Sequence, residues 1–338
     1  MSIRKTISLG FGFAVSIAFL WLIAQSLSID DFLAALGGAR PFWIFVAFSC
    51  FVLGYCCRIW RWRMMLMLYN PSLSWRRCSM PFMISIAANN VLPFRAGDVL
   101  RGVAFSKSIG VPTAQVLATL LVERLLDLLM LIMALGLVLI AFRAYSAGVL
   151  ILFNVSAGGF LLFALFVFLA LFFPRFSRMP FRWLFSKNPF QNNRLFQKLE
   201  KQVDLIFQAL SDLADRSRMA KLMLWSVFAW LFEAGLFFAV ARGLSSVSVP
   251  EAAWVAMPIG TLSTMLPSTP GYVGTFHYFV MKVFEGFGNT EASAVAFAFL
   301  VHLTLFVPAT LWGGISFVYW NVAGKGRPTM ADQRNAGI

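Results

Sequence analysis

The chain has 338 residues, of which 60% are hydrophobic and 12% are charged. Soluble globular domains contain about 25% charged residues, and a soluble fold as apolar as this one would expose large hydrophobic patches to water. The composition therefore excludes a soluble domain and indicates a polytopic membrane protein. The first apolar run, near residues 7–27, is longer than a signal-peptide core and has no clear cleavage site, so we expect a retained helix.

Six apolar runs approach or exceed the roughly 20 residues that a helix needs to cross a bilayer. They lie near residues 7–27, 42–57, 111–142, 147–173, 221–243 and 290–320. The second run is short, and we expect Arg58, Arg61 and Arg63 at its end to snorkel toward the lipid headgroups. Two shorter stretches, near 80–93 and 252–266, each lead into a segment rich in Pro and Gly.

The distribution of basic residues predicts the orientation in the membrane. The net charge is +14, and the connection at 174–221 alone carries ten Lys and Arg residues. Basic residues collect on the cytoplasmic side, where anionic phospholipid headgroups hold them. We therefore expect a protein of the cytoplasmic (inner) membrane, with both termini and this connection cytoplasmic. Anionic phospholipid at the basic loops explains the charge, and no nucleic acid partner is expected.

The membrane-embedded part is expected to be one integral-membrane domain over residues 1–325, followed by a disordered cytoplasmic tail at 326–338. Within it, hydrophobic residues recur at helical spacing over about 190–218. This segment is predicted to be a cytoplasmic amphipathic helix, either on the inner leaflet or packed under the bundle.

The reactive residue types are sparse. The four cysteines have no CxxC spacing, and the chain has two histidines. This pattern predicts no metal site and no disulfide framework. With no P-loop and no Ser-His-Asp arrangement, we expect no cofactor, no ATP-driven motor and no enzyme activity.

Two segments of the chain resemble each other. Residues 92–99 read Leu-Pro-Phe-Arg-Ala-Gly-Asp-Val, and residues 266–273 read Leu-Pro-Ser-Thr-Pro-Gly-Tyr-Val. Each follows a short apolar stretch and precedes a long apolar helix, and the charge pattern places them on opposite sides. We predict an all-α polytopic membrane protein with about six full transmembrane helices. Two re-entrant helical hairpins would form an inverted repeat, with copies at about 80–142 and 252–320, as in transporters.

Three charged residues lie inside a predicted membrane helix. Glu123 lies about 18 Å from the start of the run at 111–142, and Arg124 and Asp127 follow it. A charge at the bilayer centre costs about 2.5–3.5 kcal/mol, so the three must face protein or water. They form either a substrate or proton site or a structural ion-pair network, in which Arg124 pairs with Asp127 or Glu233.

Three other ionisable residues occupy apolar surroundings. Glu233 lies mid-helix, where it either pairs with an arginine or takes part in a proton relay. His302 lies mid-helix in the last apolar run, and His277 follows the second Pro/Gly segment. Each histidine either packs with its ring hydrogen-bonded or lines a cavity between the repeats.

Residues 89–101, 122–127 and 266–271 closely resemble the lysylphosphatidylglycerol synthase transmembrane region, also called the flippase-like domain family. The resemblance covers about residues 5–325. It implies that the domain moves lipids or lipid-linked molecules between leaflets. Some family members add a cytosolic aminoacyl-transferase domain, but this sequence ends soon after its last apolar helix, so we carry over no transferase activity.

The resemblance also implies a set of site positions. These are Arg95, Gly97, Asp98, Arg101, Glu123, Arg124, Asp127, Pro267, Pro270 and Gly271. Where the family pattern has a second Gly after Pro-Gly, this chain has Tyr272, which we expect to alter the shape of the cavity.

The function expected from the sequence is transbilayer movement of an anionic lipid or a lipid-linked glycan. The phosphate would be held by Arg95 or Arg101 and by the free N–H groups of the helix that restarts after Gly97. The alternatives are a membrane enzyme of the polyprenyl-phosphate glycosyltransferase type and an accessory subunit of a lipid-modifying synthase. The identity of the lipid and the oligomeric state stay open.

Overall fold

The computed structural model describes residues 21, 29–92, 96–141, 215–266 and 269–324, together with scattered positions between 159 and 212. The described part is helical and contains no strand. In chain order its elements are α2 (Ile29–Gly37), α3 (Pro41–Leu66), α4 (Trp75–Val91), α5 (Ala96–Ala104), α6 (Ser106–Ile109), α7 (Thr113–Ala141), α11 (Arg216–Gly243), α12 (Ala252–Ser263), η2 (Pro270–Tyr272), α13 (Thr275–Gly286) and α14 (Glu291–Gly324).

Long apolar helices dominate the described residues, as the sequence predicts. Three of them are long and apolar enough to cross a membrane: Pro41–Leu66, Arg216–Gly243 and Glu291–Val322. The helix α7 has 29 residues, about 44 Å at 1.5 Å per residue, and carries the predicted charges. The predicted runs at 7–27 and 147–173 and the amphipathic segment at 190–218 lie largely outside the described residues. The predicted tail at 326–338 lies entirely outside them.

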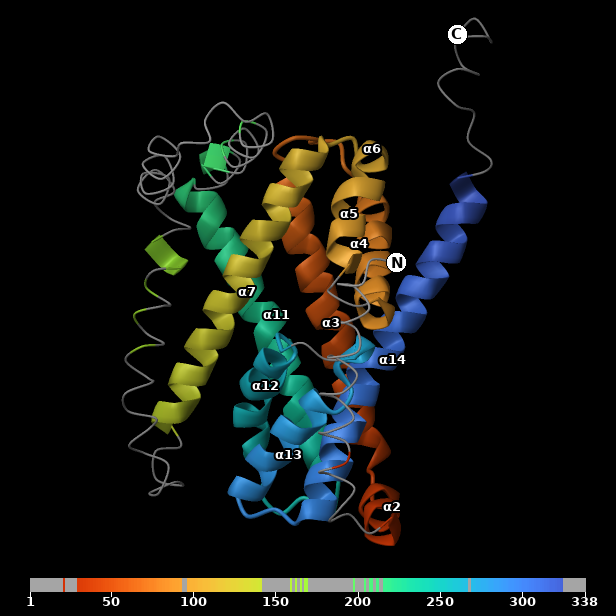
Figure 1. The fold of residues 1–338 in the computed structure, drawn as a ribbon, viewed down its shortest axis with the longest axis vertical. Helices are drawn as coiled ribbons and strands as arrows, with labels where there is room; N and C mark the ends of the chain where they lie inside the picture. The colour runs from red at the N-terminus through yellow and green to blue at the C-terminus, as the bar shows by residue number, and fades with distance from the viewer. Residues whose placement is uncertain are drawn as a thin grey trace, which may run out of the picture.

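The helices α3 and α11 lie against each other in opposite directions along the molecule (Figure 1). A Cβ on Gly54 of α3 would lie 3.5 Å from the carbonyl oxygen of Ala229 in α11, an ordinary contact distance, so the two helices pack closely at this point. The helix α3 also continues to Leu66, well past the predicted end of the run. Arg58 and Arg61 therefore lie within the helix, and the prediction that they snorkel at its end is wrong.

Two short helical hairpins occupy opposite halves of the molecule, α4 with α5 in one and α12 with α13 in the other (Figure 1). Their helices have 17, 9, 12 and 12 residues. Each hairpin is followed by a helix that runs most of the length of the molecule, α7 after the first and α14 after the second. The same order, a short hairpin and then a long helix, thus occurs in both of the sequence segments that resemble each other, 80–142 and 252–320.

The second hairpin tip meets the end of the first hairpin's opening helix. A Cβ on Gly271 would lie 3.6 Å from the carbonyl oxygen of Asn90. The Asn90 side chain in turn donates a hydrogen bond from Nδ2 to Thr310 Oγ1 of α14, at 2.9 Å. Gly271 has a φ of +75°, a left-handed conformation that glycine adopts without steric cost. The tip of the second hairpin therefore packs against the C-terminal end of α4, although Asn90 and Gly271 are about 180 residues apart in sequence.

Candidate functional site

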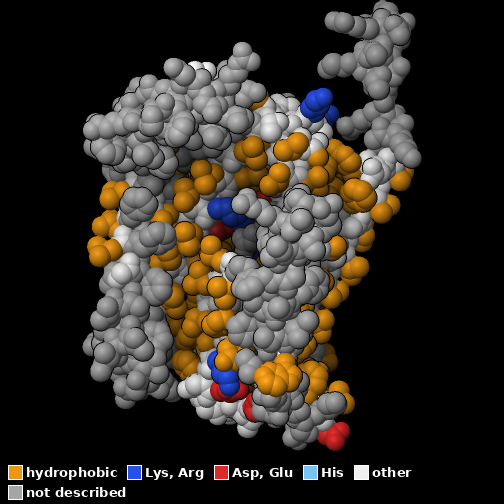
Figure 2. Space-filling model, viewed as in Figure 1, with side chains coloured by type: hydrophobic (Ala, Val, Ile, Leu, Met, Phe, Trp, Pro, Cys, Tyr) orange, Lys and Arg blue, Asp and Glu red, His pale blue; other side chains and the backbone are white. Residues whose placement is uncertain are grey.

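Charged side chains from α3, α5, α7 and α11 converge in the middle of the molecule. Four arginines and four carboxylates take part, so the formal charge of the group is zero. We call this group the charge network; its members are Arg58, Arg61, Arg101, Arg124, Asp98, Glu123, Asp127 and Glu233. In the space-filling view, charged side chains lie at a hollow in the middle of the face, and the described residues around them are mostly hydrophobic (Figure 2).

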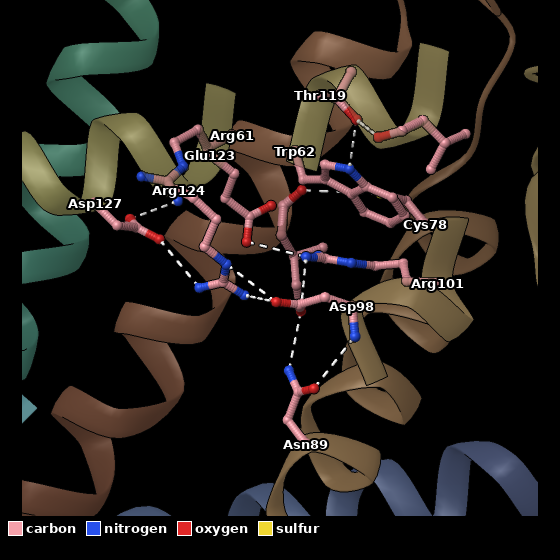
Figure 3. Close-up of polar contacts among 12 residues, drawn as sticks. Arg61, Trp62, Cys78, Asn89, Asp98, Arg101, Thr119, Glu123, Arg124 and Asp127 are labelled. Carbon is pink, nitrogen blue, oxygen red and sulfur yellow. Dashed lines mark hydrogen bonds and ion pairs between the residues drawn. The ribbon is translucent and has the colours of Figure 1, made fainter. Parts of the chain in front are cut away.

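The central pair of the network joins Arg124 of α7 to Asp98 of α5 (Figure 3). Arg124 donates to Asp98 Oδ2 from Nε at 3.1 Å and from Nη2 at 2.6 Å. Asn89 orients the carboxylate, because its Nδ2 donates to Asp98 Oδ1 at 3.0 Å and its Oδ1 accepts from the Asp98 backbone N–H at 3.2 Å. The predicted partner Asp127 lies farther away, with 3.7 Å between its Oδ2 and Arg124 Nη1.

Arg101 is enclosed by protein. Its side chain is 0% exposed, and its Nη2 lies 3.2 Å from Glu123 Oε1 and 3.6 Å from Asp98 Oδ1. Its guanidinium carbon lies 4.7 Å from the ring centroid of Trp62 and 4.6 Å from that of Phe82, in cation–π contact with both. The Arg124 side chain, by contrast, is 35% exposed. The geometry makes Arg101 a packing residue and leaves Arg124 as the more accessible cation.

Gly97 also has a packing role in the structure. A Cβ at this position would lie 2.0 Å from the backbone oxygen of Ser85 and 2.7 Å from Asn89 Oδ1. Such distances are shorter than any real contact, so α4 and α5 touch at this point only because residue 97 has no side chain. The close approach also places Asn89 next to Asp98, which supports the central ion pair.

Two members of the network were missed from the sequence. Arg61 is fully buried, with its Nη2 2.8 Å from Asp127 Oδ1 and its Nη1 donating to Ser226 Oγ at 2.7 Å. Arg58 forms an ion pair with Glu233. Glu233 was expected either to pair with an arginine or to take part in a proton relay, and this contact agrees with the first interpretation. The signal in the sequence was the i, i+3 spacing of Arg58 and Arg61, which puts both on one face if the helix continues.

A cavity of about 350 Å³ lies between the charge network and the second hairpin. Its volume falls at the small end of the range for ligand pockets, about 300–1,000 Å³. Network residues on one part of its wall are Arg58, Glu123, Arg124, Asp127 and Glu233. The second hairpin and α14 contribute Thr261, Thr264, Met265, Gly271, Tyr272, Phe276, His302, Leu305 and Phe306.

The two histidines lie in contact beside this cavity. His302 lines it, and its ring is stacked on that of His277 with 4.7 Å between the centroids and an interplanar angle of 18°. His277 is 2% exposed, and its Nδ1 accepts a hydrogen bond from the Gly274 backbone N–H at 3.3 Å, at the start of α13. The packing therefore gives His302 a place in the cavity wall and His277 a place behind it.

The remaining predicted site residues are only partly described. Arg95 and Pro267 lie outside the described residues, and Pro270 begins the η2 turn. Among the residues that the structure describes, no group of three or more His, Cys, Asp or Glu side chains is arranged to hold a metal ion.

The lysylphosphatidylglycerol synthase transmembrane region, as a family model, matches residues 10–313 of the chain. The chain belongs to this family. The resemblance stated from the sequence is thereby confirmed, and no curated protein matches the chain. Membership in the lysylphosphatidylglycerol synthase transmembrane family, together with the apolar helices, identifies an integral membrane protein and associates it with membrane lipids.

Proposed function

We propose that this chain moves the polar headgroup of an anionic membrane lipid across the bilayer through the cavity, while the lipid tails stay in the hydrocarbon. The observation that carries the proposal is the position of Arg124, a partly exposed cation in a cavity wall formed by both hairpin regions. Arginine suits a lipid phosphate because its guanidinium offers several charge-assisted hydrogen bonds to phosphate oxygens.

The pairing of Arg124 supports such a role. Asp98 holds the guanidinium through Nε and Nη2, which leaves Nη1 beyond hydrogen-bond reach of Asp127 at 3.7 Å. An arriving phosphate can therefore bind at Nη1 in place of the longer ion pair with Asp127, without displacing Asp98. The network as a whole has equal numbers of positive and negative groups. Such balance keeps the phosphate from binding so tightly that release on the other side becomes slow.

The size of the cavity favours a single headgroup. At about 350 Å³ it has room for one small polar group, whereas an extended lipid-linked glycan needs a larger or open channel. The lipid-linked glycan therefore stays the second candidate substrate of the same proposal.

We further propose that the two hairpins are re-entrant and that α4–α5–α7 and α12–α13–α14 form an inverted repeat. The hairpin helices have 9 to 17 residues, or about 14–26 Å, and are shorter than the roughly 30 Å hydrocarbon core. Irregular backbone at membrane depth is stable only where it is buried in protein or faces a wet cavity, and Gly271 and Tyr272 of the η2 turn line the cavity here.

Single cysteines test this topology. In a variant without the four native cysteines, Ser72→Cys before α4 and Glu251→Cys before α12 are both at exposed positions. We expect a membrane-impermeant maleimide to label residue 72 from the cytoplasmic side and residue 251 from the opposite side of the inner membrane. Labelling of both from one side contradicts the inverted repeat.

Transport by Arg124 variants tests the proposed function. In proteoliposomes, the parent protein should move fluorescent phosphatidylglycerol faster than it moves phosphatidylcholine, and Arg124→Gln should slow the anionic lipid about tenfold or more. A charge-assisted hydrogen bond contributes about 1.5–3 kcal/mol, and 1.4 kcal/mol corresponds to about a factor of ten. The matched control is Arg77→Gln, at an exposed arginine of α4 outside the cavity.

Two further measurements separate folding from transport and exclude the alternatives. The double variant Asp98→Asn/Arg124→Gln keeps the network neutral, so it should fold better than the single variant while staying inactive. A parent protein that moves neither lipid faster than protein-free vesicles contradicts the proposal and favours an accessory subunit. Transfer of a radiolabelled sugar from a sugar nucleotide to a polyprenyl phosphate would instead indicate the glycosyltransferase alternative.

A further inference from the structure

Tyr272 adopts a backbone conformation that side chains rarely occupy. Its φ is +59°, and it is the one non-glycine residue with a positive φ in the part of the chain that the structure describes. A left-handed conformation brings the Cβ of a large residue close to its own backbone, and such strain persists only where the surroundings hold it. The tip of the second hairpin must therefore be held tightly at this residue.

The contacts around Tyr272 explain how the tip is held. The Tyr272 backbone N–H donates to the Thr269 carbonyl at 3.0 Å, and Thr275 Oγ1 donates to the Tyr272 carbonyl at 3.2 Å. The preceding Gly271 is also left-handed, and a Cβ on it would lie 2.8 Å from the Phe306 ring. These contacts fix the peptide on both sides of Tyr272 and with it the direction in which its side chain leaves the turn.

That direction places Tyr272 in the wall of the cavity, in the same lining as Arg124 and Tyr55. The side chain is thus a large aromatic group in a space of only about 350 Å³. A glycine at this position would adopt the left-handed backbone conformation without strain and would leave the cavity wider. The strained tyrosine therefore reduces the space beside the accessible arginine.

We propose that Tyr272 is a specificity-determining residue that limits the size of the headgroup that the cavity admits. The inference rests on the proposed function in so far as a lipid headgroup enters this cavity. The selection is steric, because the aromatic ring of Tyr272 sets the distance between the hairpin tip and a phosphate bound at Arg124. A headgroup with a bulky substituent on the phosphate is excluded, and a small one is accepted.

The first arm of the test measures stability and does not depend on transport. Tyr272→Gly relieves the left-handed strain, whereas Tyr272→Ala keeps it, so the glycine variant should have a melting temperature a few degrees above that of the alanine variant in detergent. Equal melting temperatures overturn the argument that residue 272 is held in a strained conformation.

The second arm measures size selection with phosphatidic acid, phosphatidylglycerol and phosphatidylinositol, whose headgroups increase in that order. We expect Tyr272→Gly to raise the ratio of phosphatidylinositol to phosphatidylglycerol about tenfold, both in native-mass-spectrometry binding and in proteoliposome transport, a factor that corresponds to about 1.4 kcal/mol. Tyr272→Phe is the matched control and should keep the parent ratio, because it keeps the ring.

The outcomes distinguish this inference from the proposed function. A stable Tyr272→Gly variant that transports lipid with the parent size ratio overturns the role of Tyr272 and leaves transport intact. A changed binding ratio in a protein that transports nothing supports Tyr272 and contradicts flipping. Absence of lipid binding in both the parent and Tyr272→Gly overturns both.

Discussion

Arg101→Ala is expected to lower the free energy of unfolding by about 3–5 kcal/mol, because removing one partner of a buried ion pair leaves the other charge uncompensated. The surviving partner is Glu123, whose side chain is 3% exposed and 3.2 Å from the Arg101 guanidinium. The substitution also removes the cation–π contacts with Trp62 and Phe82. Thermal unfolding in detergent, monitored by the amount of folded protein that remains, measures the effect.

Two variants serve as controls for Arg101→Ala. Arg77→Ala changes an exposed arginine of α4 and should leave the melting temperature close to that of the parent. Arg101→Met/Glu123→Gln removes both charges and should recover part of the lost stability, since an apolar replacement of a buried pair is often tolerated. If Arg101→Ala is as stable as Arg77→Ala, the buried ion pair is not a structural element of the fold.

Gly97→Ala is expected to destabilise the protein by about 1–3 kcal/mol or more, the usual effect of inserting atoms into a packed interior. The new Cβ would lie 2.0 Å from the Ser85 carbonyl oxygen, a backbone atom that cannot move without opening the hairpin of α4 and α5. Gly313→Ala should act similarly between α14 and α4, where the nearest atom is the Met83 carbonyl oxygen at 2.3 Å.

The neighbouring glycine supplies a matched control. Gly314 lies next to Gly313 in α14, but a Cβ on it would meet no heavy atom within 4 Å, and the same holds for Gly136 in α7. Gly314→Ala and Gly136→Ala should therefore keep the parent melting temperature or raise it slightly, because alanine favours helix. Equal losses at Gly313 and Gly314, or at Gly97 and Gly136, would contradict the packing explanation.

The sequence alone predicted a membrane protein, its all-helical fold and the charged residues at the centre of the candidate site. Long apolar runs require a bilayer and a helical backbone, because every backbone polar group must be paired inside the membrane. Glu123, Arg124 and Asp127 stand out for the same reason, since charges at that depth need partners. The family resemblance also followed from local motifs, and the match over residues 10–313 confirms it.

Only the tertiary structure decided which charge pairs with which and which of them faces the cavity. Arg101 and Arg124 are both arginines beside apolar residues, yet one is enclosed between two rings and the other is partly exposed. Arg58 meets Glu233 across 175 positions of sequence. Pairing at such separation depends on how α3, α7 and α11 pack, because turning any of these helices by one residue, about 100°, would move its charged side chains off the shared face. Hydropathy and spacing describe each helix by itself, whereas the site is a property of the contacts between helices.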